Sequence, residues 1–326
     1  MVILGLAGDT MLGRLVGERL AADGPRSLVA PEVVAVAHEA DLFLLNLECC
    51  ISDRGEPWPA PGKPFFFRAP PAAVEVLDLL GVDCVTLANN HALDFGPAAL
   101  LDTFTHLARA GIAWVGAGPD VARAHAPVSV DACGYRLIVV AATDHPADFA
   151  ADVERPGVAW VDLRHRAPAW LLDTVRSAAS DIAASSIPGG VLVTPHWGPN
   201  MVADPVPHVR RAARALRDAG ATLVAGHSAH VFQGVDGTVL YDLGDFLDDY
   251  ATNPLLRNDL GLLFLVELDQ LGPKRLHAVP LALDFCRTRL ASGDDAAWIA
   301  DRFRRACSAF GTAVHIDEDR LVINWR

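Results

Sequence analysis

Side chains that can bind a metal ion or transfer a proton stand just after several of the buried strands that this sequence predicts. In chain order they are Asp9, Glu48, Asn90, His91, His196, His227 and His230. Their donor atoms are oxygen and nitrogen with no thiolate, which favours Mn, Fe, Zn or Mg over a structural cysteine site. Because they exceed the needs of one tetrahedral ion, we expect two divalent cations that share the carboxylate of Glu48 or Asp9.

The elements that must position these residues follow from the hydrophobic pattern. Short apolar runs alternate with amphipathic stretches, which predicts an α/β fold. The expected strands are 2–7, 41–47, 84–88, 113–115, 136–141, 191–194, 222–225, 239–243 and 262–268. The expected helices are 12–21, 31–38, 71–80, 97–110, 167–186 and 207–219. Because the carboxyl ends of strands in an open α/β sheet face one crevice, we predict that the polar residues converge there.

Two regions depart from this alternation. Residues 51–70 are rich in Pro and Gly and too long for a simple connection, so they could form a lid over the site or a plain surface loop. Beyond residue 270 we expect strands over 275–290, a helix over 296–310 and a final hairpin over 313–325. We find no linker, so the prediction is one domain over 1–326, with its motifs in 1–250 and with 251–326 completing or covering the sheet.

Composition excludes several classes of function. The formal net charge of −13 argues against a nucleic-acid partner, because the average field repels polyanions. No apolar run approaches the roughly 18–20 residues that cross a bilayer, and no signal peptide is evident, so we expect a cytoplasmic protein without a membrane partner. The six cysteines show no Cys-x-x-Cys spacing, which predicts reduced and mostly buried thiols.

Several motifs resemble those of the CapA (poly-γ-glutamate capsule biosynthesis) family. They are Gly8-Asp9-Thr10-Met11-Leu12-Gly13-Arg14, Asn46-Leu47-Glu48, Phe67-Arg68-Ala69-Pro70, Ala88-Asn89-Asn90-His91-Ala92-Leu93-Asp94, His196-Trp197-Gly198, Gly226-His227-Ser228-Ala229-His230 and Tyr241-Asp242-Leu243-Gly244-Asp245-Phe246. Their order and spacing match over residues 1–250. The resemblance implies a four-layer α/β/β/α sandwich of two mixed sheets, similar to the calcineurin-like metallophosphoesterases, with a dinuclear metal site at the strand ends.

The resemblance also implies roles for these residues. Asp9 would bind the first metal, and Glu48 would occupy the bridging position. Asn90 and His196 would bind the second metal, while His227 and His230 stand in for the paired histidines of the closing motif. His91, with Asp94 beside it, resembles the pair that protonates a leaving group. As substrate contacts we expect Asn46, Arg14, Arg68, Trp197 and Asp245.

The sequence departs from the phosphoesterase pattern at four places. Met11 stands where a histidine normally follows the first aspartate, and the closing motif is His-x-x-His instead of His-x-His. Pro199-Asn200 follows His-Trp-Gly where many relatives carry an acid, and Asp245 replaces the usual asparagine. These changes put phosphatase activity in doubt more than they put metal binding in doubt.

Three functions therefore stay open. The first is a hydrolase that acts on a phosphoester or a peptide or γ-glutamyl amide, with His91 as general acid. The second is a metal-dependent peptide epimerase, as the resemblance permits for ribosomal and lasso peptides, in which Asp9 and one histidine exchange the Cα proton. The third is a binding protein without activity. The partner is a peptide or a small molecule, and a Lys or Arg near the site would suit a carboxylate.

Overall fold

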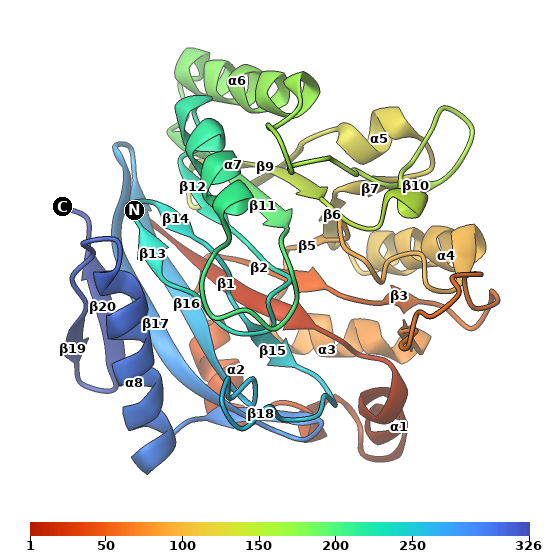
Figure 1. The fold of residues 1–326 in the computed structure, drawn as a ribbon, viewed down its shortest axis with the longest axis horizontal. Helices are drawn as coiled ribbons and strands as arrows, with labels where there is room; N and C mark the ends of the chain where they lie inside the picture. Colours follow the sequence, from red (N-terminus) through yellow and green to blue (C-terminus); the bar gives the residue numbers. More distant parts are fainter.

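The structure is a computed structural model that describes all residues from 1 to 326. Its largest sheet has ten strands (Figure 1). Their order is β19 (His315–Asp317), β20 (Arg320–Asn324), β17 (Gly272–Asp284), β16 (Leu260–Asp269), β1 (Val2–Thr10), β2 (Leu42–Leu47), β5 (Cys84–Thr86) and β6 (Ala113–Val115), with β15 (Asp245–Leu247) beside β1 and β18 (Arg287–Leu290) beside β17. From β1 to β6 the strands are parallel, while β16 pairs with β1 antiparallel, so the sheet is mixed.

A second sheet has six strands and is also mixed. Their order is β13 (Val235–Asp236), β14 (Val239–Leu240), β12 (Leu223–Ala225), β11 (Gly189–His196), β9 (Tyr135–Thr143) and β8 (Val128–Ala132). The strands β9, β11, β12 and β14 run parallel, and the two edge strands are antiparallel to their neighbours. Two small pairs complete the strands, β3 (Cys50–Ile51) with β4 (Arg68–Ala69) and β7 (Ala117–Gly118) with β10 (Gly157–Val158).

Eight α-helices accompany these sheets. They are α1 (Arg14–Asp23), α2 (Pro31–Ala37), α3 (Val74–Leu79), α4 (Gly96–Arg109), α5 (Val121–His125), α6 (Ala169–Ala184), α7 (Pro207–Asp218) and α8 (Gly293–Ser308). Three short 3₁₀ turns lie at Pro25–Ser27, Pro71–Ala73 and Ala147–Phe149. The α/β class predicted from the alternating pattern is confirmed. No helix is long and apolar enough to cross a lipid bilayer.

Alternating side chains of the central strands enter different apolar clusters. In β2, Leu42 and Leu44 pack with side chains of the six-stranded sheet, whereas Phe43 and Leu45 pack towards α1–α4. In β9, odd-numbered residues such as Val139 join the cluster between the sheets, and the intervening residues pack under α6 and α7. Because such strands are buried on both faces, they read in the sequence as continuous apolar runs.

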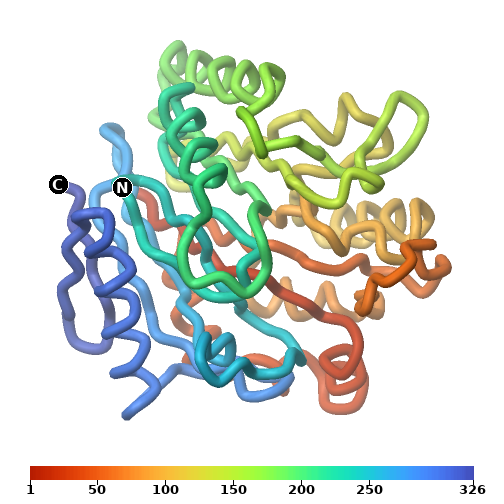
Figure 2. The backbone as a smooth tube through the Cα atoms, in the orientation of Figure 1, coloured from red at the N-terminus to blue at the C-terminus, as the bar shows by residue number.

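Residues beyond 250 add strands to the sheet that contains β1. The strands β16, β17 and β20 extend it by antiparallel pairing, and α8 packs its buried Ile299 and Phe303 into the cluster between the sheets. Both ends of the chain therefore lie in one sheet, as the red and blue segments of Figure 2 show. The half-exposed edge strand β8 and the short elements β3, β4, β15 and α5 were not predicted from the sequence pattern.

Candidate metal centre

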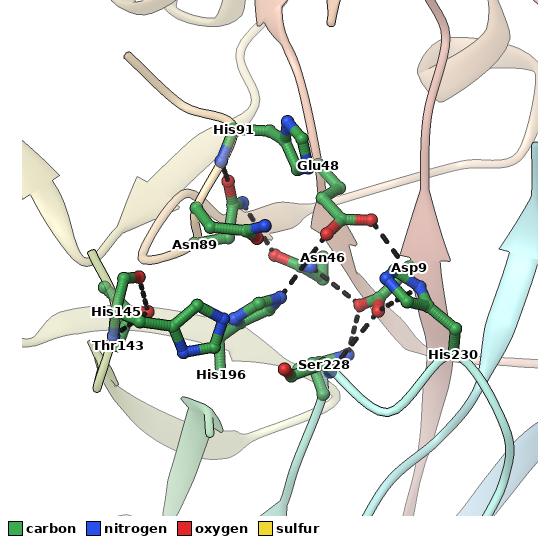
Figure 3. A network of polar contacts seen from close by, with 12 residues as sticks. Asp9, Asn46, Glu48, Asn89, His91, Thr143, His145, His196, Ser228 and His230 are labelled. Carbon is green, nitrogen blue, oxygen red and sulfur yellow. Dashed lines mark hydrogen bonds and ion pairs between the residues drawn. The ribbon is translucent and has the colours of Figure 1, made fainter. Parts of the chain in front are cut away.

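Five of the predicted donor residues meet where strands of both large sheets end. Asp9 belongs to β1, and Glu48 directly follows β2. His196 is the last residue of β11 and forms a parallel bridge with His227, which follows β12. His230 comes from the same loop as His227, and all five side chains are buried. Figure 3 shows Asp9, Glu48, His196 and His230 pointing towards one another from separate elements.

The contacts between these residues are short. The Nδ1 atoms of His227 and His230 lie 3.2 and 3.3 Å from the carboxylate oxygens of Asp9. His196 Nε2 lies 3.4 Å from Glu48 Oε1. One ligand atom each from Asp9, Glu48 and His230 falls within 4.8 Å of the other two. A single cation could therefore contact these three residues without a large rearrangement.

Several donor atoms of the cluster are buried without a hydrogen-bond partner. They are Glu48 Oε1, both ring nitrogens of His196, His227 Nδ1 and Asn90 Oδ1. Buried polar atoms in native proteins are nearly always paired, so orphaned atoms require an explanation such as an ion. Carboxylate oxygens, imidazole nitrogens and an amide oxygen form a mixed O and N set that suits a divalent transition metal or Mg. The residues present therefore fit a divalent cation.

The pKa values of the ionisable groups in the cluster are shifted in different directions. Burial and the neighbouring Asp9 raise the pKa of Glu48 well above its usual range. For Asp9, burial acts in the same direction, but the nearby imidazole of His227 and the charges of the other histidines outweigh it and lower its pKa. Burial lowers the pKa of His196. A cation would offset the crowding of buried carboxylates and favour neutral imidazoles as ligands.

Hydrogen bonds from surrounding residues orient the donor side chains. Asn46 donates to Asp9 Oδ1 at 2.8 Å, and Tyr250 donates its hydroxyl hydrogen to Glu48 Oε2 at 3.2 Å. His227 Nε2 contacts Thr194 Oγ1 at 3.1 Å, which leaves Nδ1 facing Asp9. Partners of this kind are typical of the groups that orient metal ligands.

His230 is held by a carboxylate and by an unusual backbone conformation. Its Nδ1 lies 2.8 Å from Asp245 Oδ1. Its φ of +56° is in the left-handed region, which few residues other than glycine adopt, although histidine is enriched among those that do. Such strained positions are frequent at functional sites. This conformation aims the ring towards Asp9 and Glu48.

The His91–Asp94 pair lies beside the donor cluster. His91 Nδ1 and Asp94 Oδ2 are 2.6 Å apart, and the Phe67 N–H donates to the same oxygen at 2.7 Å. Lys63 donates to the other oxygen of Asp94 and to the carbonyl of Asn90. Burial lowers the pKa of His91 to about 4 despite the opposing effect of Asp94. Near neutral pH, His91 is therefore a neutral imidazole.

A pocket with a volume of about 550 Å³ opens over these residues. Its walls include Asn90, His91 and His230 from the site. Lys63 and Phe65, from the irregular 51–70 region, line it as well. The segment that could have been a plain surface loop thus forms one wall of the pocket.

Residues 3–250 match the family model described as bacterial capsule synthesis protein PGA_cap. The chain belongs to this family. The membership predicted from its motifs is confirmed.

Relatives within the capsule synthesis family differ in how much of their length is matched. A Mycobacterium tuberculosis protein named probable polyglutamine synthesis accessory protein is 33% identical over 300 residues, which cover 86% of this chain and 76% of that protein. The PGA biosynthesis protein CapA of Bacillus subtilis is 29% identical over 74% of this chain and 62% of its own length. The capsule biosynthesis protein CapA of Bacillus anthracis is 28% identical, with shares of 75% and 59%.

One solved structure, of a hypothetical protein from Thermus thermophilus, aligns with a TM-score of 0.42 and 15% identity. The alignment covers 88% of this chain and 96% of that chain.

Of the five expected substrate contacts in this family member, only Arg14 lines the pocket. Asn46 and Asp245 lie beneath it and bond to Asp9 and His230. Trp197 is buried, and its indole N–H donates to the Tyr241 carbonyl at 2.9 Å. The guanidinium of Arg68 donates to the carbonyls of Arg54 and Gly55 and lies over the ring of Phe95. None of these four side chains lines the pocket, and their contact with substrate stays a prediction.

The structure also shows the surroundings of Met11 and of the six cysteines. Met11, at the position of the missing histidine, is fully buried in the apolar cluster under α1–α4, and its sulfur accepts the Gly13 N–H. Five of the six free cysteines are buried. Burial raises the pKa of the Cys50 thiol to about 12, which argues against a nucleophilic role.

Sequence reasoning missed several residues at the site. Tyr250 lies in an irregular segment where no periodic pattern marks it, and Thr194 looks like an ordinary strand residue. Lys63 was noticed in the sequence but was interpreted as a structural or surface residue, whereas it lines the pocket. His145 was also missed; its ring centroid lies 5.1 Å from that of His196 (Figure 3). The available signal was a polar residue shortly after a buried strand, and among these residues only His145, two residues after β9, carries it.

Proposed function

We propose that this member of the capsule synthesis family is a metal-dependent enzyme that hydrolyses an amide or phosphoester bond. The observation that carries the proposal is the set of buried, unpartnered donor atoms on Glu48, His196 and His227. Unpaired polar atoms in so dry a place are costly unless a ligand satisfies them. A divalent cation, such as Mn, Zn, Fe or Mg, is the ligand that suits this set best.

The chain offers ligands for two cations. Asp9, Glu48 and His230 would hold one, because their donor atoms are already close together. A second would be held by Glu48 with His196, His227 and Asn90, whose free donor atoms are otherwise unexplained. A divalent cation supplies a Lewis acid that polarises the electrophile and lowers the pKa of water.

The remaining chemistry comes from side chains around the cluster. Asp94 fixes the orientation of His91 through Nδ1, which leaves Nε2 free to take a proton from the attacking water and to pass that proton to the leaving group. Lys63 and the Phe67 N–H hold Asp94 in place, so the imidazole has a defined direction. Aromatic side chains around His91 reduce its contact with water, which strengthens electrostatic interactions inside the pocket.

The layering supports a metallophosphoesterase-like sandwich. One apolar cluster lies between the two large sheets, one between the ten-stranded sheet and α1–α4, and one between the six-stranded sheet and α6 and α7. This succession of helix, sheet, sheet and helix is the order that the proposed four-layer fold requires. The α8 helix packs with the inner cluster, beside the six-stranded sheet.

A second candidate is a peptide epimerase, which one observation favours. His91 and His230 both line the pocket, and Figure 3 shows them on different sides of Glu48. Inversion at Cα requires one group to remove the proton and another to return it on the opposite face, so in this alternative His230 would transfer a proton instead of holding the cation. The missing histidine at Met11 weakens the phosphoesterase pattern without affecting such a pair.

Metal analysis combined with product analysis tests these proposals. We expect the purified protein to bind Mn or Zn, and the variants Asp9→Asn and His230→Asn to lose it. Phosphoesters, peptide amides and γ-glutamyl amides would then be incubated with the metal-loaded protein in D₂O. Cleavage supports the hydrolase, whereas deuterium at Cα without cleavage supports the epimerase. A protein that binds no metal and turns over no substrate of either class would contradict the proposal.

The role of His91 has its own test. His91→Gln is expected to retain metal and to lower kcat by about 10²–10⁴-fold, the usual contribution of a general acid. His38→Gln is the matched control, because His38 lies away from the pocket and contacts the Leu79 carbonyl. Equal activity of the two variants would remove His91 from the mechanism.

A further inference from the structure

The pocket has an aromatic wall that runs from the protein surface down to the histidines of the site. Phe65 stacks on Phe67 with ring centroids 6.4 Å apart, and Phe67 stacks on Tyr250 at 5.6 Å. Phe67 also lies against the His91 ring at 3.9 Å, and Tyr250 meets His230 edge-on at 5.3 Å. A substrate that enters the pocket therefore passes along aromatic rings before it reaches the donor cluster.

Two large aromatic side chains at the mouth of this pocket are exposed. Phe65 is 53% exposed and Phe285 is 60% exposed, and both line the pocket. They come from distant parts of the chain, the 51–70 region and the turn between β17 and β18. Single exposed apolar side chains are ordinary, but two at one pocket mark a surface that an apolar ligand would cover.

The positively charged side chains that line the pocket already have ion-pair partners. Arg14 forms an ion pair with Asp249 at 3.1 Å, and its guanidinium lies over the rings of Phe65 and Phe67 at 5.3 and 5.4 Å. Lys63 is held by Asp94. The sequence suggested that such residues would suit a carboxylate-bearing substrate, but the structure leaves neither charge free. A run of glutamate side chains would meet no unpaired cation on these walls.

We infer that the substrate is a peptide that places an aromatic side chain against Phe65, Phe67 and Phe285. The inference rests on the proposed function for where the reaction occurs, and it adds the class of substrate. A volume of about 550 Å³ is in the range that encloses small ligands and short peptide segments. The amide of Asn200 lines the same pocket and can donate to and accept from a peptide backbone.

Binding of small blocked amino acids tests the inference. N-acetyl-phenylalanine methylamide, N-acetyl-glutamate methylamide and tri-γ-glutamate would be titrated into the full chain and followed by ligand-observed NMR. We expect the aromatic compound to bind at least about tenfold more tightly than either glutamate compound. Phe65→Ala and Phe285→Ala should each weaken its binding about three- to tenfold, as expected for the loss of one aromatic contact.

Leu271→Ala is the matched control, because Leu271 is 76% exposed in the turn between β16 and β17 and does not line the pocket. It should leave binding unchanged. Circular dichroism would verify that each variant is folded; both phenylalanines are more than half exposed, so folding should persist. Tighter binding of the glutamate compounds, or unchanged binding in both phenylalanine variants, would overturn the inference.

Repeating the titrations with chelator and with Mn separates this inference from the proposed function. Aromatic binding without metal uptake or turnover would leave the substrate class in place and reject the metal-dependent enzyme. Metal-dependent turnover of γ-glutamyl compounds, with no preference for the aromatic ligand, would support the metal-dependent enzyme and reject the aromatic substrate class.

Discussion

Lys63 and Asp94 form a buried ion pair that joins the irregular 51–70 region to the His91 side of the pocket. The same carboxylate contacts His91 Nδ1 at 2.6 Å and accepts the Phe67 N–H at 2.7 Å. One side chain thus connects the orientation of a candidate general acid with the position of the segment that carries the aromatic wall.

Lys63→Met tests how much this pair contributes. The Lys63 side chain is 16% exposed and Asp94 is fully buried, so the variant leaves a buried carboxylate without its charged partner. We expect the free energy of unfolding to fall by about 1–3 kcal/mol. Limited proteolysis should cut within 51–70 faster than in the wild type.

Lys274→Met is the control, because Lys274 also forms an ion pair with a carboxylate but is more exposed to solvent than Lys63. Its side chain is 45% exposed and lies 3.6 Å from Glu267, so we expect a loss below about 1 kcal/mol in urea unfolding. Equal losses in the two variants would show that the Lys63 pair is no stronger than a surface ion pair.

Much of the fold and part of the site could be predicted from the sequence, for a physical reason. Strands covered on both faces, such as β2 and β9, read as apolar runs, and the polar residue that follows each run is easily seen. Asp9 and Glu48 were found in this way. The half-exposed β8 and the three-residue β15 gave no such signal, because edge strands and short strands bury too little to shape the pattern.

Contacts between distant segments could not be predicted. Tyr250 lies 202 residues from Glu48 along the chain, and only the folded arrangement brings its hydroxyl group to the carboxylate. Lys63 sits in a stretch without periodicity, so nothing in the sequence relates it to Asp94. The pairing of Arg14 with Asp249, which changes the expected substrate, was hidden for the same reason.

Tyr250→Phe tests the support of the Glu48 carboxylate. The variant removes the hydrogen bond to Glu48 Oε2. Because Oε1 already lacks a hydrogen-bond partner, both oxygens of Glu48 would then be unpaired. We expect the affinity for Mn to fall by about tenfold, as for other losses of a group that orients a ligand. Tyr241→Phe removes a similar bond, 3.2 Å from Asp236, and should leave Mn affinity unchanged in calorimetric titrations. Similar Mn affinities in both variants would exclude the role assigned to Tyr250.

Two buried threonines near the site should respond in opposite ways to replacement by valine. Thr194 Oγ1 contacts His227 Nε2, whereas Thr86 Oγ1 is buried with no hydrogen-bond partner. Thr194→Val should lower the free energy of unfolding by about 1–2 kcal/mol and weaken Mn binding, because the imidazole loses its partner. Thr86→Val should be neutral or stabilising by up to about 1 kcal/mol, because a costly unpaired hydroxyl is replaced by a methyl group. Denaturant unfolding with chelator, and then with Mn, measures both effects; destabilisation by Thr86→Val would indicate a partner for its hydroxyl group.

Asp102 provides a pH test of how the 51–70 region is anchored to α4. Hydrogen bonds from the Arg54 guanidinium, with a further one from Ser52, lower the pKa of Asp102 to about 2. Because the folded pKa is below the unfolded value of about 3.9, the unfolded state binds more protons between these values, so stability rises with pH there. The stabilising contribution is therefore complete above about pH 4–5 and is lost as the pH falls through about 2.

The comparison with Asp102→Asn isolates this contribution. We expect the wild type to be more stable than the variant at pH 6, by a small amount because Arg54 is 68% exposed. The difference should shrink as the pH falls below about 4, and NMR titration of the Asp102 carboxyl group should give a midpoint near 2. A midpoint near 4, or a stability difference that does not change with pH, would mean that Arg54 does not hold this carboxylate in solution.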